Sequence, residues 1–522
     1  MPGLLFKEAP PIVTATPNRA DIVCFVGYVG RRATALSSPA KSWLQNHGWR
    51  PLGTPVADLD PLLNTPVPLA SFEAFDRLYS WETRPLDSNN FSHTTWLGAA
   101  VRSFFRQGGA RCFVVRVGDP WAPVYLSENA PQAALDAAAA TRLTRLRLLF
   151  PGYSGTAFPS AQAPGTWLGH GVMLGLQEAS TLCFPDLPEI VADATLDPTG
   201  LAPLPPSPEV FSECTPELAS PEDEVRQISP SPACTAAGYT TWCAAVRTAS
   251  YFIRTQRRDA QLLLALPLPA PGSEGEIMRF MDDPMQTFGL AQSTDMPNGI
   301  ASAFCQLTYP WLVTPGAESL PGGLEPPDGV FSGVLARSIP TLGVAHSIGL
   351  QPLRGVHGFS PSLSGRDLQL DTATGARPAL IHRISLLGRT PDGPRILSDV
   401  TTSLDAQHRP ACVGRLTAAI LRTARQLGDT VAFESSGEIL WQRIRTQLDR
   451  LLSDFYAAGA LNGATKADAY SVRCDATTTT QNDMDNGRVI AEVRFAPAHP
   501  IGLITVVLAL RDGSITSQTT TA

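Results

Sequence analysis

The sequence predicts an α/β domain followed by a smaller α+β domain, with an extended arm at each end of the chain. Helical and strand-like stretches alternate over residues 21–350, a pattern typical of a doubly wound parallel sheet. The last third instead carries two amphipathic helices followed by short alternating strands. Prolines set an apolar segment apart at each end of the chain. We therefore expect arms at 1–20 and 501–522, a first domain at 21–365 and a second at 366–500.

The composition indicates a folded protein of more than one part. A chain of 522 residues exceeds a single ordinary core, and 43% of its residues are hydrophobic and 17% charged. The formal net charge of -7 offers no basic surface for nucleic acid. The nine cysteines are scattered and include no CxxC pair, so we expect reduced thiols and a cytoplasmic assembly rather than a disulfide framework. No apolar run is long enough to cross a bilayer as a helix, and no signal peptide is recognised at the start.

The first half of the α/β domain begins with a predicted core strand at Asp21–Val29. Ser71 is placed to cap a short helix, because a serine oxygen can accept a hydrogen bond from a free backbone N–H of the first turn. A stronger helix is predicted at His93–Gln107, with apolar residues at helical spacing, and Gly108-Gly109 ends it. The continuous apolar run within Arg111–Val117 predicts a strand covered on both faces, as in a parallel sheet.

The alternation continues through the rest of this domain. We predict a helix at Trp167–Leu176 and a strand at Ser180–Phe184, which Pro185 ends. Residues 192–235 are rich in proline and serine and predict a loop or insertion. A helix at Tyr239–Arg257 and a buried strand at Ala260–Leu266 follow.

The second domain begins with two predicted helices. The first spans Cys412–Leu427, and Ser435–Glu438 has the pattern of a capping box for the second. Gly459 ends the second helix, as expected for a residue that adopts the left-handed conformation easily. Its apolar stripe consists of Leu440, Ile444, Leu448, Leu451 and Phe455.

Alternating strands and one long apolar strand close the chain. Ala469–Cys474 and Arg488–Phe495 alternate between apolar and polar residues, and Asn486-Gly487 lies between them, a dipeptide suited to a turn. Ile501–Leu510 (IGLITVVLAL) predicts a further, strongly apolar strand, after which we expect a polar tail. An apolar strand beyond a proline-marked joint needs a partner surface.

No pattern in the sequence predicts catalysis, a cofactor or a metal. The eight histidines lack metal-ligand spacing, and structural or surface histidines explain them. Ser154 lacks the flanking glycines of a nucleophile elbow. Asp475, Asp483 and Asp485 do not fit a calcium loop, because Asp475 is too far from the other two. We therefore expect no catalytic, cofactor-binding or metal-binding residues.

Three segments in a fixed order carry more specific patterns. They are Ala303–Leu312 (AFCQLTYPWL), Pro326–Arg337 (PPDGVFSGVLAR) and Gly343–Gly355 (GVAHSIGLQPLRG). Together they resemble the contractile tail sheath family, which phage tails and bacterial contractile injection systems share. Weaker agreements fall in order as well, at Leu97–Val117, Leu182–Leu187, Leu387–Thr390, Phe433-Glu434, Gly459–Gly463 and Tyr470–Cys474. The chain departs from the family in lacking a tryptophan before Gly388, in the 192–235 segment and over 41–90.

The resemblance implies a structural protein. Sheath subunits have an outer α/β domain of subtilisin-like topology without a protease triad, and an inner C-terminal domain that faces a tube. Identical subunits would form an open helix around an inner tube protein, with baseplate and terminal cap proteins at its ends. Contraction would drive the tube through a target envelope. The particle would be a phage tail or a phage tail-like assembly.

The resemblance also implies that the arms donate strands to neighbouring subunits. The expected inter-subunit residues are Leu4, Phe6, Ile12, Val13, Ile501, Ile504, Val506, Val507 and Leu508. Burying a ten-residue apolar strand would contribute on the order of 10 kcal/mol before ordering costs. Pro497 and Pro500 are placed to stiffen the joint before the donated strand, and Gly502 to let it bend.

Two other readings remain open. The same fold would suit a sheath-like cap or baseplate component, which needs fewer copies. A subtilisin-like hydrolase is suggested by the implied topology alone, and it would need a Ser/His/Asp constellation that the sequence does not show.

Overall fold

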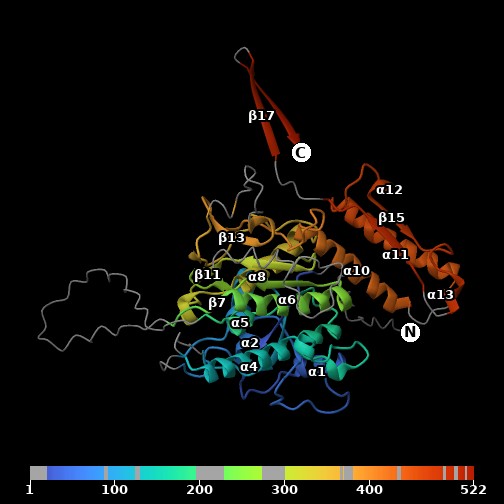
Figure 1. Ribbon diagram of the computed structural model, residues 1–522. Coiled ribbons are helices and arrows are strands. Elements are labelled where there is room, and N and C mark those ends of the chain that lie inside the picture. The colour runs from blue at the N-terminus through green and yellow to red at the C-terminus, as the bar shows by residue number, and fades with distance from the viewer. Residues whose placement is uncertain are drawn as a thin grey trace, which may run out of the picture.

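The structure is a computed structural model. It describes residues 20–87, 92–123, 130–194, 229–272, 300–364, 368, 380–431, 437–485, 489–498, 504–511 and 514–521. In the last two stretches it describes the strands but not the side chains. An α/β domain forms the main body, and a smaller group of helices and strands from the last third of the chain lies at its side (Figure 1).

A large, mostly parallel sheet forms the centre of the α/β domain. Its eight strands lie in the order β14-β13-β10-β8-β6-β1-β5-β3. All neighbouring pairs are parallel except the two edge pairs, β13 with β14 and β3 with β5. The strands are β1 (Val23–Tyr28), β3 (Pro66–Leu69), β5 (Cys112–Gly118), β6 (Thr181–Cys183), β8 (Gln261–Ala265), β10 (Cys305–Tyr309), β13 (Ser385–Thr390) and β14 (Gly393–Ile396).

Helices cover both faces of this sheet. Alternate residues of β1 enter different cores: Val23 and Phe25 belong to one hydrophobic cluster, and Cys24 and Val26 to the other. The first cluster includes α3 (Trp96–Gln107), α8 (Pro327–Leu342) and α10 (Ala411–Val431). The second includes α4 (Gln132–Leu149), α5 (Leu187–Val191) and α6 (Ala236–Gln256). The doubly wound arrangement predicted from the alternation is confirmed.

Short elements complete the α/β domain. Helix α2 (Phe72–Leu78) begins where predicted, with the Ser71 hydroxyl accepting a hydrogen bond from the Ala74 amide at 3.3 Å. The others are β2 (Gly30–Arg31), α1 (Ser38–Asn46), β4 (Tyr79–Ser80), η1 (Tyr153–Gly155), η2 (Pro164–Thr166), η3 (Gly169–Leu174), β7 (Ala233–Cys234), β9 (Leu268–Pro269), β11 (Trp311–Val313), η4 (Pro321–Gly323), β12 (Gly358–Ser360) and η5 (Leu380–His382).

Two glycines let helices α3 and α8 approach closely. A Cβ on Gly329 would lie 2.5 Å from the Cα of Ala100, and one on Gly333 would lie 2.5 Å from the backbone oxygen of Phe104. Both glycines fall on the same side of α8, because four residues make about one helical turn. Helix α8 is therefore packed backbone against backbone on α3, inside the domain.

The predicted helix at Trp167–Leu176 is wrong. The structure has a short 3-10 helix, η3, at Gly169–Leu174. Gly169 has φ of 49°, and a side chain there would meet the Leu148 carbonyl oxygen at 2.4 Å. Three glycines within ten residues lower helix propensity, and the tighter 3-10 turn takes the place of an α-helix.

Helix α4 was not predicted from the sequence. Its first half is rich in alanine, which favours helix intrinsically but gives no apolar stripe to recognise. Its C-terminal end is anchored by the buried Leu146 and Leu149. The predicted 192–235 loop lies mostly outside the described residues, and its last part contains β7, which pairs with β9.

The α/β domain extends further along the chain than expected. Strands β13 and β14 lie within the 366–500 range that we assigned to the second domain, yet they belong to the large sheet. Thr308 and Tyr309 of β10 pair with Ser385 and Leu386 of β13. Pairing between strands so far apart in sequence leaves no local signal, and it moves the boundary beyond Ile396.

The smaller domain consists of three helices and a two-stranded sheet in the described residues. Its elements are α11 (Glu438–Ala457), α12 (Lys466–Ala469), β15 (Tyr470–Arg473), α13 (Gln481–Asp485) and β16 (Glu492–Phe495). Helix α11 begins at Glu438, directly after its N-cap residue Gly437, and has no side-chain cap hydrogen bond. The predicted capping box, which would place Glu438 three residues after the N-cap, is therefore wrong. Ser435 and Ser436 lie outside the described residues. A capping box does form at α12, between Thr465 and Asp468.

Candidate assembly surfaces

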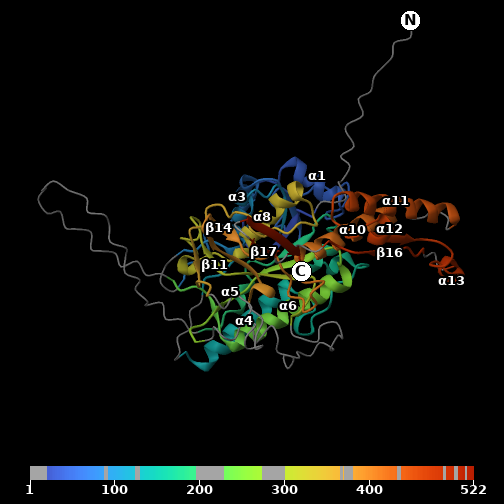
Figure 2. The same ribbon diagram turned by 90° about the horizontal axis from the view of Figure 1, so that it is seen from above.

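The end of the chain forms a β-hairpin that stands apart from both domains. Strand β17 (Ile504–Arg511) pairs antiparallel with β18 (Ser514–Thr521), from Ile504 with Thr521 to Arg511 with Ser514. Figure 1 shows the hairpin projecting away from the α/β domain. In the view from above, the hairpin overlaps the middle of the molecule (Figure 2). The polar stretch after Leu510, which the sequence predicted only as a tail, forms strand β18.

The sequence did carry a signal for this hairpin. The dipeptide Asp512-Gly513 lies between the two strands, and such a pair between strand-forming runs favours a two-residue hairpin turn. Thr516, Thr519 and their neighbours add strand propensity. The second strand was not predicted, because its residues are polar rather than alternating between apolar and polar.

The structure places only some of the predicted inter-subunit residues. Ile504, Val506, Val507 and Leu508 all lie in β17. Ile501 precedes it and lies outside the described residues, as do Pro500 and Gly502 of the predicted hinge and the whole N-terminal set, Leu4, Phe6, Ile12 and Val13. The assembly role of these residues stays a prediction.

Pro497 is held by the smaller domain rather than free. It forms a bridge with Leu461, and the flanking Ala496 and Ala498 are hydrogen-bonded to the same neighbouring strand segment. The Ala498 amide donates to the Ala460 carbonyl at 3.0 Å, and the Ala496 carbonyl accepts from the Asn462 amide at 2.9 Å. Any joint between the smaller domain and the hairpin therefore begins after Ala498.

The sheet of the smaller domain has edges that no described strand covers. Strands β15 and β16 pair with each other from Tyr470–Phe495 to Arg473–Glu492, and within the described residues no third strand joins them. Tyr470 and Val472 are buried and Ser471 and Arg473 exposed, so one face rests on the domain. Uncovered strand edges present free N–H and C=O groups that can accept an added strand.

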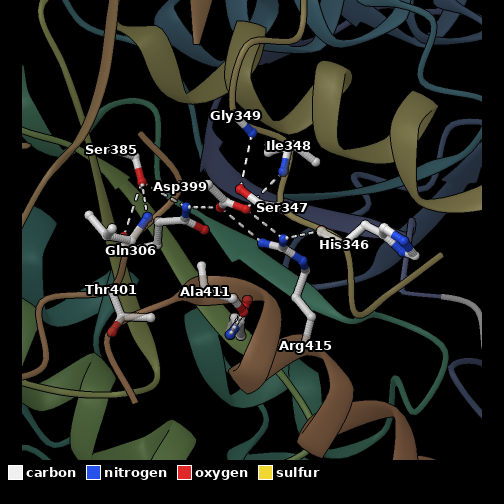
Figure 3. Close-up of polar contacts among 12 residues, drawn as sticks. Gln306, His346, Ser347, Ile348, Gly349, Ser385, Asp399, Thr401, Ala411 and Arg415 are labelled. Atoms are coloured by element: carbon white, nitrogen blue, oxygen red, sulfur yellow. Dashed lines mark hydrogen bonds and ion pairs between the residues drawn. The ribbon is translucent and has the colours of Figure 1, made fainter. Parts of the chain in front are cut away.

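A buried ion pair fixes helix α10 to the α/β domain (Figure 3). Arg415 on α10 donates to both carboxylate oxygens of Asp399, at 3.1 Å from Nη1 to Oδ1 and 2.6 Å from Nη2 to Oδ2. Asp399 also accepts from the Gln306 side chain at 2.9 Å and from the Ile348 amide at 3.0 Å. Arg415 donates to the His346 carbonyl at 3.0 Å. The pair thus joins α10 to β10 and to the loop after α8.

The charges of this pair are matched within the protein interior. The side chain of Asp399 is 0% exposed and that of Arg415 is 3% exposed. Burial alone would raise the pKa of the Asp399 carboxyl, but Arg415 and the hydrogen bonds from Ile348 and Gln306 hold that pKa below its ordinary value. Asp399 is therefore an ionised carboxylate that depends on Arg415 for compensation.

A second buried cluster fixes α10 further along its length. Asp259 accepts from Arg257 at 3.0 Å and from Arg425 on α10 at 3.0 Å. Arg422, also on α10, donates to the Asp259 carbonyl. Arg415 and Arg425 are ten residues apart, about 15 Å along a helix. Two attachment points at this distance restrict both tilt and rotation of α10.

The two domains also share one hydrophobic core. Leu416 and Ile420 of α10 lie in the same cluster as Leu440 and Phe455 of α11 and as Phe25 of the central strand β1. The smaller domain is therefore packed continuously onto the α/β domain. Together with the two polar attachments of α10, this packing joins the two domains.

A serine, a histidine and an aspartate do come together, in a geometry unsuited to catalysis. His93 Nε2 lies 3.1 Å from Asp87 Oδ2 and 3.1 Å from Ser229 Oγ, and Ser229 Oγ itself donates to Asp87 Oδ2 at 3.0 Å. A catalytic triad needs the acid and the serine on different nitrogens of the imidazole. Here one nitrogen faces both, and all three residues are buried. The constellation therefore ties chain segments together.

Other chemistry finds no support in the described part of the chain. No group of three or more His, Cys, Asp or Glu side chains there is arranged to hold a metal ion. No helix in the same residues has the length and hydrophobicity needed to cross a bilayer. The eight cysteines that the structure describes are buried, and none of these eight forms a disulfide.

The fold is similar to the folds of chains in several solved structures. A chain in the cryo-EM structure of the anti-feeding prophage helical sheath in its contracted state is similar at a TM-score of 0.51 and 17% identity, covering 98% of this chain and 99% of that chain. A chain in the contracted PVC sheath complex, an extracellular contractile injection system, is similar at a TM-score of 0.50 and 16% identity, covering 98% and 97%. The chain has the contractile sheath fold.

The sheath fold extends over both domains, because the alignments cover nearly all of each chain. A chain in the anti-feeding prophage baseplate structure is similar as well, with a TM-score of 0.54 and 16% identity over 98% of this chain and 99% of that chain. No protein-family model matches the sequence, and no curated protein matches it. The likeness of this sheath-fold chain to known proteins is thus one of structure.

Proposed function

We propose that the chain is a structural sheath subunit of a contractile injection machine. Many copies would polymerise as an open helix around an inner tube and contract to drive that tube through a target envelope. The observation that carries the proposal is the likeness over 98% of the chain to chains in two contracted sheath structures.

In this assembly, strands donated from one subunit to the next hold neighbouring subunits together. Strand β17 is apolar in sequence and projects from the body in β-conformation, while β15 and β16 leave edges uncovered by described strands. Adding a strand from a neighbour would satisfy the backbone groups of both. Such a head-to-tail contact does not close on itself, so it builds a helix. The N-terminal arm, with Leu4, Phe6, Ile12 and Val13, would donate at the other end.

Contraction would move each subunit as a rigid body on flexible arms. The shared core and the two attachments of α10 support a rigid body. The backbone is held by the smaller domain up to Ala498. We place the hinge immediately beyond it, at Pro500 and Gly502, with Pro497 as its fixed base.

The partners follow from this role. We propose an inner tube protein inside the sheath, with baseplate and terminal cap proteins at its ends, within a phage tail or phage tail-like particle assembled in the cytoplasm. The smaller domain would face the tube. The outer domain would retain a subtilisin-like topology without activity, since Asp87, His93 and Ser229 lack a relay geometry. We propose neither nucleic acid nor membrane as a partner.

One other role has a specific observation in its favour. Chains in two anti-feeding prophage baseplate structures are similar at TM-scores of 0.54 and 0.56, so a sheath-like baseplate or cap component would suit the same fold. The two roles differ in copy number and in the shape of the assembly. A sheath forms long striated cylinders, and a baseplate or cap component forms discrete rings.

Electron microscopy of the purified chain, expressed with its tube protein, tests the proposal. We expect hollow striated cylinders from the full chain. A variant that ends at Ala498 removes the hairpin but leaves the hydrogen bonds to Ala460 and Asn462 in place, so it should fold and remain monomeric. A full-length Leu52→Asp variant, altered at a side chain that is 82% exposed on the α/β domain, is the control and should still assemble. Cylinders from the truncated chain would exclude strand donation by the hairpin.

A further inference from the structure

An apolar groove lies where the two domains meet. Its volume is about 610 Å³. The C-terminal end of α8, the residues that follow it and the C-terminal end of α11 line the groove. Ile339, Val344 and Phe455 form a buried floor, and Leu342, 38% exposed, stands at the rim. The volume is within the ~300–1,000 Å³ typical of pockets that enclose a ligand. The groove can therefore hold several apolar side chains.

The groove is also the place where the described chain begins. Asp21 lines it, and the adjacent Ala20 is buried. Nineteen residues precede Ala20 in the sequence. The residues immediately before Ala20 therefore lie near the groove, because the chain joins them to Ala20.

The preceding segment has the chemistry that the groove would accept. It carries two apolar groups, Leu4-Leu5-Phe6 and Ile12-Val13. Val13 is seven residues before Ala20, a span of at most about 25 Å when extended, so the pair can return to the groove. Pro17-Asn18 lies between them and the domain, and both residues favour turns. Water would otherwise surround these apolar side chains in a free subunit.

We propose that in the unassembled subunit Ile12-Val13 of the chain's own N-terminal segment lie in the groove between α8 and α11. The floor residues Ile339, Val344 and Phe455 receive the two β-branched side chains, and Leu342 covers them from the rim. This docking shields the N-terminal segment in the free subunit. It concerns a single chain, so it does not depend on the sheath role proposed above.

Photo-cross-linking of the full-length monomer tests the docking. A benzoyl-phenylalanine replaces Val13, the monomer is isolated by size exclusion, and cross-linked peptides are identified by mass spectrometry. We expect cross-links to Ile339–His346 or to Asp454–Ala460. Mixing ¹⁵N-labelled and unlabelled monomers separates cross-links within a chain from those between chains. Cross-links only between chains, only to other surfaces, or none at all would overturn the proposal.

Two matched variants test whether the segment docks in the groove. Leu342→Asp places a charge at the rim, and Leu350→Asp makes the same change at a side chain that is 62% exposed and does not line the groove. The first should reduce the docked-to-free ratio about tenfold, the effect of losing one large apolar contact, and the second should leave it unchanged. Ala458→Trp fills the groove and should abolish the cross-links. Equal yields in Leu342→Asp and Leu350→Asp would place the segment elsewhere. Microscopy of assemblies reports separately on the sheath role.

Discussion

Replacing Arg415 by methionine should loosen helix α10 from the α/β domain. Methionine keeps much of the apolar length of the side chain but removes both hydrogen bonds to Asp399 and the one to the His346 carbonyl. The Asp399 carboxylate, with a side chain that is 0% exposed, would keep only the donors from Gln306 and Ile348. An ionised carboxylate would then lie in the interior without a cation.

The burial of the Asp399–Arg415 pair determines how large the loss of stability should be. Breaking a buried ion pair by removing one partner costs about 3–5 kcal/mol, because the remaining charge is buried and uncompensated. Since about 1.4 kcal/mol is a factor of ten, the population of molecules with α10 detached should rise by roughly one hundredfold to several thousandfold. Asp399→Asn in the same chain should recover part of the loss, because it removes the uncompensated charge.

Hydrogen–deuterium exchange of the α10 amides measures this opening directly. Arg425→Met is the matched control on the same helix: Arg425 is 37% exposed, and its partner Asp259 retains Arg257. A partly exposed pair contributes about 0–1 kcal/mol, so exchange in the control should rise less than about tenfold. Equal exchange in Arg415→Met and Arg425→Met would refute the assignment of Asp399–Arg415 as the main attachment of α10.

Three further predictions concern the α/β domain. Burial raises the pKa of the Asp328 carboxyl to about 7; the folded state therefore holds a proton that the unfolded chain releases near pH 4, and the free energy of unfolding should fall by up to about 1.4 kcal/mol per pH unit between pH 4 and 7. Asp328→Asn should flatten that dependence in urea titrations, and an unchanged slope would contradict it. Gly333→Ala should destabilise the protein by about 1–3 kcal/mol because its Cβ would meet the Phe104 carbonyl oxygen, whereas Gly428→Ala, with open space around it, should stabilise by up to about 1 kcal/mol; thermal unfolding compares them. Ser229 should not react with a fluorophosphonate probe, and labelling that Ser229→Ala removes would revive a hydrolase.

Much of the fold follows from local patterns in the sequence. Continuous apolar runs predicted the central strands β1, β5 and β8, because a strand covered on both faces has no polar side. Helical spacing of apolar residues predicted α3, α6, α10 and α11. The order of motifs also indicated the sheath fold. These signals are carried by residues close together in the chain, where the period of the structure is visible.

Errors arose where local patterns were weak or were overruled. Glycine content outweighed the apolar spacing at η3, and the alanine-rich start of α4 gave no stripe to recognise. The polar residues of β18 concealed a strand that the preceding Asp512-Gly513 could have revealed.

By itself, the sequence determined the two kinds of domain, the central strands and main helices, and the apolar strand at the end of the chain. Only the tertiary structure decided how these parts are joined. Gln306 and Asp399 are 93 residues apart, and Ser229 and Asp87 are 142 apart. The pairing of β13 with β10, the attachment of α10 by Arg415 and the groove at Asp21 depend equally on distant segments. Contacts of this kind have no period along the chain, because they exist only once the sheet has brought those segments together.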